Sequence, residues 1–211
     1  AEGRSEALEG SLFSRADRAL ESFVTSNETV YYAGIIAMDG KVLGHRVDKQ
    51  QGPSKFIGQD FTDREYFQKS KNGQTCVVGI KSASTGLIAT VIAMPLKQDD
   101  KVVAVLAAGI DNKILSNTTT DKIKVGQKGM VYVYDMKGRM VLHPDGSALG
   151  RDDSKLPHVA QLLKERDGRT RFVNDKGESK GLYFKALPHE GWIICVEFDR
   201  AEIFKPISDL L

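Results

Sequence analysis

The chain has 211 residues, of which 41% are hydrophobic and 27% are charged, as in ordinary folded domains. This composition excludes a disordered tail, a collagen-like fibre and a disulfide-rich miniprotein. The 30 lysines and arginines against 28 acidic residues leave a formal charge of +2, and so small an excess does not indicate a nucleic-acid partner.

The cysteines, the histidines and the length of the apolar runs argue against further classes of protein, namely disulfide-bonded, metal-binding and membrane-spanning chains. Cys76 and Cys195 each lie in a strand-like apolar run, which favours two separately buried thiols over a disulfide or a metal cluster. The histidines are scattered without the spacing of metal ligands. The longest apolar run, residues 102–110, is far shorter than the roughly 18 to 20 residues that span a bilayer, so we expect no membrane span and no signal peptide within the chain.

The first predicted element is an amphipathic helix over residues 4–26. Its apolar side chains recur every three or four residues, at Leu8, Leu12, Ala16, Leu20 and Phe23. It begins almost at the first residue without a clear cap, and the helix-like stretch 201–211 ends the chain without a C-terminal glycine. We therefore expect the sequence to be a piece of a longer chain.

Strand signals follow this helix. The apolar runs 31–38 and 41–47 flank Asp39-Gly40, a dipeptide typical of tight turns between antiparallel strands. These runs predict a β-hairpin.

A short helix and three strands are expected next. Thr62 and Glu65 have the spacing of a capping box, which predicts a helix that begins there and continues through Ser70. The strands are expected at residues 75–81, 86–96 and 101–110, with a turn at 98–100 joining the last two.

The second half repeats this order of elements. Strand-like runs at 129–134 and 139–143 flank Lys137-Gly138, and apolar spacing predicts a helix over 156–166. Three more strands are expected at residues 169–174, 180–187 and 191–198.

Two copies of hairpin, helix and three strands predict an α+β chain of two small modules, each an antiparallel sheet with flanking helices. We expect a long helix over residues 4–26, a first module over 27–115, a polar linker over 116–125, a second module over 126–200 and a helix leading out over 201–211.

In this order the residues resemble the double Cache sensor domain, in which two PAS-like modules are stacked along a long N-terminal helix. The matching segments are residues 63–67, 84–86 and 109–111 in the first half, and 126–135, 137–138, 143–144 and 191–192 in the second. The resemblance extends from about residue 5 to residue 205. It implies the non-catalytic sensor domain of a bacterial chemoreceptor, or else of a sensor kinase, without a cofactor. It also implies a homodimer anchored in the inner membrane by segments outside this sequence, with this domain in the periplasm or outside the cell.

The resemblance further implies a ligand site in the first, membrane-distal module. Members that bind amino acids carry an arginine, aromatic residues two and three positions after it, and an aspartate at the end of the module. Arg64, Tyr66, Phe67 and Asp111 fall on those positions. Short hydroxyls nearby would complete the site, at Ser82, Ser84 and Thr85.

These residue types suit a zwitterion. The Arg64 guanidinium can give two parallel hydrogen bonds to a carboxylate, and Asp111 can accept hydrogen bonds from an ammonium. The aromatic pair would form walls and the hydroxyls the few polar groups of an otherwise apolar pocket.

Structural roles would explain the same residues. Arg64 lies between Asp63 and Glu65 and could form a solvated ion pair at a helix start. Tyr66 and Phe67 could be core residues, and Asp111 could end a strand and cap the next helix.

We expect a sensor that binds a small carboxylate-bearing metabolite, foremost an amino acid, and signals by helix displacement. The alternatives are a sensor for a short organic acid or another small metabolite, a module that recognises a periplasmic protein, and an enzyme. No nucleophile elbow, Cys-His pair or metal motif supports the enzyme.

Overall fold

A computed structural model of the chain describes residues 15–48, 54–81 and 88–203. Its contacts divide the chain into two units, one of Ala1–Ile80 with Ala89–Asp111, the other of Lys81–Ile88 with Asn112–Leu211. Over the described ranges, no helix is long and apolar enough to cross a lipid bilayer. Of the predicted N-terminal helix, residues 15–25 are described and are helical.

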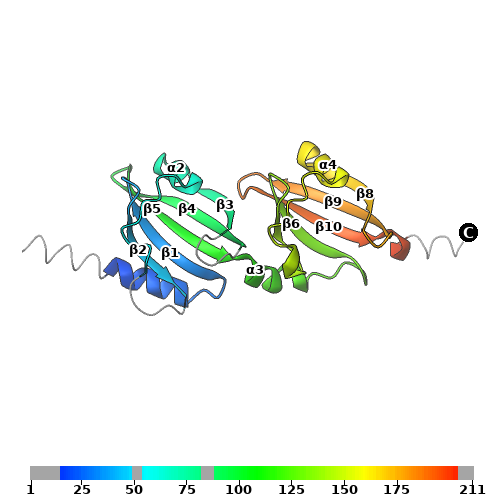
Figure 1. Cartoon of the computed structure of the whole chain (residues 1–211), viewed down its shortest axis with the longest axis horizontal. Helices are drawn as coiled ribbons and strands as arrows, with labels where there is room; N and C mark the ends of the chain where they lie inside the picture. Colours follow the sequence, from blue (N-terminus) through cyan, green and yellow to red (C-terminus); the bar gives the residue numbers. More distant parts are fainter. Residues whose placement is uncertain (1–14, 49–53, 82–87, 204–211) are drawn as a thin grey trace, which may run out of the picture. The chain divides into compact units, whose positions relative to one another are not determined.

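The first unit is built on one five-stranded antiparallel sheet (Figure 1). Its strands are β1 (Val30–Ala37), β2 (Val42–Val47), β3 (Cys76–Lys81), β4 (Ile88–Gln98) and β5 (Lys101–Asp111), in the order β2-β1-β5-β4-β3. All five strands that the sequence predicts for this half are present, and each lies within two residues of its predicted bounds.

The predicted β1–β2 hairpin is confirmed. The glycine of its turn, Gly40, has a φ of 90°, a conformation that side chains disfavour. The β4–β5 turn is less usual, because Asp99 and Asp100 have φ values of 49° and 61° without being glycines. Two successive residues with positive φ match the right-handed twist of the flanking strands.

The predicted capping box at the next helix is wrong. Helix α2 (Glu65–Lys71) begins three residues after Thr62, and its N-cap residue is Arg64. The carboxylate of Asp60 accepts a hydrogen bond of 2.8 Å from the Thr62 amide, so Thr62 lies in a turn ahead of the helix. Glu65 instead forms an ion pair of 2.9 Å with Lys69, one helical turn later.

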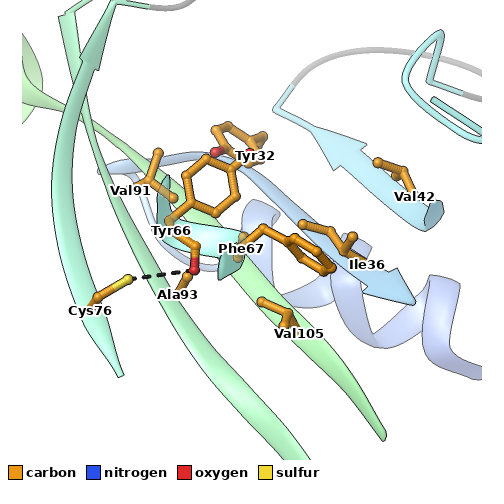
Figure 2. Packing of buried hydrophobic residues seen from close by; sticks show 10 residues of the cluster. Tyr32, Ile36, Val42, Tyr66, Phe67, Cys76, Val91, Ala93 and Val105 are labelled. Atoms are coloured by element: carbon orange, nitrogen blue, oxygen red, sulfur yellow. Dashed lines mark hydrogen bonds between the residues drawn. The ribbon is translucent and has the colours of Figure 1, made fainter. Parts of the chain in front are cut away.

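Each face of the first sheet carries a helix. Helix α2 covers one face, and Phe67 packs there against β1 and β5 residues such as Ile36 and Val105 (Figures 1 and 2). On the other face, Leu20 and Val24 of the N-terminal helix pack against Ala33 and its neighbours. Apolar side chains therefore alternate between two separate clusters along each central strand.

The second unit repeats this architecture. Its strands are β6 (Met130–Asp135), β7 (Met140–Leu142), β8 (Asp167–Val173), β9 (Ser179–Leu187) and β10 (Trp192–Asp199), in the order β7-β6-β10-β9-β8. Helix α4 (Pro157–Glu165) buries Val159 and Leu162 in the core on one face of this sheet. Both sheets have the same strand order, so the predicted repeat and the α+β class are confirmed.

The polar stretch 116–125 is partly helical. Helix α3 (Asn112–Thr118) begins directly after β5, and a 3-10 turn follows at Thr120–Lys122. Ser116 and Thr120 are buried, and the Ser116 hydroxyl accepts a hydrogen bond of 3.1 Å from the His143 amide. These contacts attach the stretch to the second unit.

Candidate functional site

The candidate site lies on the face of the first sheet that α2 covers. Val105 and Ala107 of β5 point to this face, since both belong to the core cluster that contains Phe67. Side chains alternate along a strand, so Gly109 and Asp111 lie on the same face, toward the end of β5. Tyr32 of β1 also belongs to this cluster, opposite Gly109.

Two tyrosines form the polar centre of this face. Tyr32 and Tyr66 lie next to each other in Figure 2, and each hydroxyl affects the pKa of the other. Burial raises the pKa of Tyr66 to about 12, while the Arg64 charge acts in the opposite direction. Burial and the neighbouring Tyr66 likewise raise the pKa of Tyr32. Both phenols are therefore neutral at physiological pH and can donate hydrogen bonds to an anion.

Arg64 brings a positive charge to the tyrosine pair. Its guanidinium carbon lies 5.3 Å from the centre of the Phe61 ring, and its Nε lies 3.4 Å from an Asp63 carboxylate oxygen. The Arg64 side chain is 45% exposed. An exposed ion pair of this kind contributes at most about 1 kcal/mol, and a bound carboxylate could displace it.

Asp111 is the last residue of β5. It pairs with Ala89 of β4, and its backbone amide donates a hydrogen bond of 2.8 Å to the Thr29 carbonyl. Gly109, two residues earlier on the same face, leaves space for the Tyr32 ring. The structure thus joins Arg64, Tyr66 and Tyr32 into one electrostatically coupled group and places Asp111 at the strand end beyond Gly109.

The remaining predicted site residues lie elsewhere. Phe67 is fully buried in the core beneath this face, in contact with the sheet. Ser82, Ser84 and Thr85 lie outside the described residues.

Sequence reasoning missed two aromatic residues of this face, Tyr32 and His45. The His45 ring stacks on Tyr32 with centroids 5.1 Å apart and contacts Phe56 at 5.0 Å. Its side chain is buried, and Nδ1 has no hydrogen-bond partner. Burial lowers the pKa of His45 to about 4, so the ring is neutral at physiological pH. Both residues lie in the predicted hairpin, but only the pairing of β1 with β5 shows their relation to Asp111.

Arg64 and the two phenols carry hydrogen-bond donors of the kind that a carboxylate accepts, and the Asp111 carboxylate carries acceptors of the kind that an ammonium group needs. In the part of the chain that the structure describes, no group of histidine, cysteine, aspartate and glutamate side chains could hold a metal ion.

The two repeated PAS-like sheets define a double-module α+β domain. A family model described as the Cache domain matches residues 4–207 of the chain. The chain therefore belongs to the Cache domain family, as the motifs predicted. Among curated protein sequences, no significant match was found.

Solved structures with the same fold include ligand-binding domains of chemoreceptors and extracellular domains of putative histidine kinases. The ligand-binding domain of Mlp24, solved with asparagine, has a TM-score of 0.66 and 19% identity over 98% of this chain and 86% of its own. The extracellular domain of the putative histidine kinase mmHK1S-Z3 has a TM-score of 0.77 and 11% identity over 94% and 83%.

Another structural neighbour is the ligand-binding domain of the Campylobacter jejuni chemoreceptor Tlp3, solved with 4-methylisoleucine. It has a TM-score of 0.71 and 15% identity over 94% of this chain and 76% of its own. At these identities the likeness establishes the fold.

Proposed function

We propose that this chain is the extracytoplasmic ligand-binding domain of a bacterial transmembrane receptor. We favour a chemoreceptor over a sensor kinase. We also propose that the first unit binds an amino acid. The domain would act without catalysis and without a cofactor. The intact receptor would be a homodimer anchored in the inner membrane.

The observation that carries this proposal is the cation beside two neutral phenols on the sheet face that ends in Asp111. Arg64 with Tyr66 and Tyr32 offers several donors to one carboxylate, which is more than a solvated ion pair needs. Two of the structural neighbours, Mlp24 and Tlp3, were solved with molecules that carry both a carboxylate and an amine. Asp111 would bind the amine.

The other predicted residues would have supporting roles. Phe67 would hold Tyr66 against the sheet, since both belong to the same buried cluster. Ser82, Ser84 and Thr85 would contribute hydroxyl groups that bind the ligand.

Signalling would follow from a change in the relative stability of two states. A ligand shifts such an equilibrium only through its different affinities for the two states. Helix displacements of about 1 to 2 Å are a common way in which such a change of state is transmitted through a protein. The signal would leave through the helix that begins near Ala201.

Thermal unfolding in the presence of amino acids, short organic acids, amines and nucleobases tests the proposal. A ligand that binds only the folded protein should stabilise it by about 2.7 kcal/mol at a concentration one hundred times its dissociation constant. Titration calorimetry should give the affinity of each compound that stabilises the protein.

Variants then locate the site. Arg64→Ala and Asp111→Ala should each abolish the ligand-induced stabilisation while the protein stays folded, and Arg18→Ala, an exposed arginine of the same unit, should not. Retained binding in both site variants would show that the pocket lies elsewhere. Binding lost in Arg64→Ala alone would indicate an organic acid without an amine, and no response to any compound would favour a protein partner.

A further inference from the structure

The two sheets place different residues at one equivalent position. In the first unit, Ala89 of β4 lies opposite Asp111, the last residue of β5. In the second sheet, β9 occupies the position of β4, and β10 occupies the position of β5. There Lys180 of β9 lies opposite Asp199, the last residue of β10. Each aspartate is followed directly by helical residues. The second unit therefore has a lysine where the first has an alanine facing its aspartate.

The Lys180 ammonium is buried and contacts two carboxylates. The side chain is 4% exposed, and Nζ lies 3.1 Å from a carboxylate oxygen of Asp199 and 3.1 Å from one of Glu178. Burial by itself lowers the pKa of an ammonium group, but the bonds to Glu178 and Asp199 outweigh it and raise the pKa of Lys180. The same ammonium holds the pKa of Asp199 below its usual value. Both groups are thus charged at neutral pH.

Asp199 also fixes the start of the helical turn at residues 200–203. One of its oxygens accepts the bond from Lys180, and the other accepts a hydrogen bond of 2.8 Å from the Ala201 amide. In the same turn, the Glu202 carboxylate accepts a hydrogen bond of 2.9 Å from the Gln127 amide, which precedes β6. The chain leaves the sheet through a turn that is held at two points.

The other acidic group on this face does not replace Asp199. Glu197 lies two residues earlier on β10, and the Tyr132 hydroxyl lies 3.3 Å from its carboxylate. Burial raises the pKa of Glu197 above its usual value. Glu178 is shared with Asn174, whose amide nitrogen lies 2.9 Å from the same oxygen that faces Lys180. Among these groups only Asp199 also bonds the helical turn.

We propose that Lys180 is a built-in ammonium group that occupies, in the second unit, the position an amine ligand would take beside Asp111 in the first, and that it holds the C-terminal helical turn to the sheet through Asp199. The comparison with Asp111 rests on the proposed function, whereas the attachment of the helical turn does not. The second unit thereby keeps the arrangement of an amine-bound module without a ligand.

A buried ion pair such as Lys180–Asp199 is not explained by stability alone. Well-packed apolar residues in place of a buried pair are often as stable or more stable, so stability alone is a weak reason for this lysine. Because the Lys180 ammonium bonds one carboxylate oxygen of Asp199, the other oxygen is left to accept from the Ala201 amide. Lys180 would thereby determine how the helical turn at residues 200–203 begins.

Chemical rescue tests the proposal. Lys180→Ala removes three carbons and the ammonium, which is the size of n-propylammonium. Hydrogen exchange, followed by mass spectrometry, would be measured on the amides of residues 199–203. We expect these amides to exchange about tenfold faster in Lys180→Ala than in the wild type, and to slow again when n-propylammonium is added. The control variant is Lys185→Ala, an exposed lysine of the same strand, which should exchange like the wild type.

The outcomes separate this proposal from the proposed function. No amino acid is present, so the result does not depend on Arg64 or Asp111. Unchanged exchange in Lys180→Ala, or equal rescue by neutral 1-propanol, would overturn the proposal. If Lys180→Ala does not fold, Lys180→Met with Asp199→Asn leaves no unpaired charge between the two positions. Faster exchange of residues 199–203 in that folded variant than in Asp199→Asn alone would support the proposal, and exchange equal to that of Asp199→Asn would overturn it.

Discussion

Tyr32 of β1 lies directly over Gly109 of β5, where an added Cβ would come within 2.0 Å of the tyrosine ring. The glycine therefore allows the strand pair to carry a large aromatic side chain on the candidate site face.

Replacing Gly109 with alanine should displace Tyr32. The new methyl group would meet two Tyr32 ring atoms at 2.0 and 2.3 Å, and overpacking of this kind costs about 1 to 3 kcal/mol. Urea denaturation measures the loss of stability, and calorimetry should show weaker ligand binding. Gly79→Ala on β3 is the control, because a Cβ there meets nothing within 4 Å. Equal stability of the two variants would contradict the assigned packing.

Removing the Tyr66 hydroxyl tests whether the phenols donate to the ligand. Tyr66→Phe keeps the buried ring, so the fold should persist. A hydrogen bond to a charged group contributes about 1.5 to 3 kcal/mol, so ligand affinity measured by calorimetry should fall at least about tenfold. Tyr183→Phe, at an exposed position of the second unit, should bind like the wild type. Unchanged affinity of Tyr66→Phe would exclude the hydroxyl from the site.

His45 should make the protein less stable as the pH falls. Burial lowers its pKa from 6.5 to about 4, so the unfolded chain takes up a proton at a higher pH than the folded protein does. The neutral His45 ring therefore contributes its full share to the free energy of unfolding above pH 6.5, and this share is lost as the pH falls toward 4. Each pKa unit corresponds to about 1.4 kcal/mol, so the free energy of unfolding should drop by about 2 kcal/mol between pH 7.5 and pH 5.

Denaturation of His45→Phe at both pH values isolates this effect. The variant should lose the His45 share of the drop, about 2 kcal/mol, and keep the share of the half-buried His143 and His158, whereas His189→Ala, at an exposed turn, should keep the whole drop. An identical pH dependence in His45→Phe and the wild type would show that His45 does not titrate as its burial requires.

Asp100 should be replaceable with a gain in stability. Its φ of 61° costs a residue with a side chain about 1 to 2 kcal/mol, and glycine avoids this cost, whereas the greater freedom of glycine in the unfolded chain offsets about 0.4 to 1 kcal/mol. Thermal unfolding of Asp100→Gly should therefore show a higher midpoint. Asp175→Gly is the matched change at an exposed turn residue without positive φ, and its midpoint should fall. A lower midpoint in Asp100→Gly would contradict the turn geometry.

Local signals explain what the sequence predicted well. Asp39-Gly40 and the apolar runs beside it depend on neighbouring residues, so the β1–β2 hairpin was predictable. Repetition of the whole element order made the second sheet predictable from the first. The capping box failed because Asp60, just upstream, competes for the Thr62 amide.

The candidate site was only partly predictable because its parts come from distant strands. Arg64 and Tyr66 are close in sequence, and their pattern could be recognised. Tyr32 and His45 join them only through the pairing of β1 with β2 and β5, which a single sequence does not reveal. The lysine opposite Asp199 was hidden for the same reason, since it depends on the register of β9 against β10.

The division of the chain after Asp111 has a mechanical consequence. A single peptide bond links this aspartate, at the close of the first sheet, to Asn112, the opening residue of α3 in the second unit. Any force that pulls on the Asp111 backbone is therefore transmitted to α3 through covalent structure.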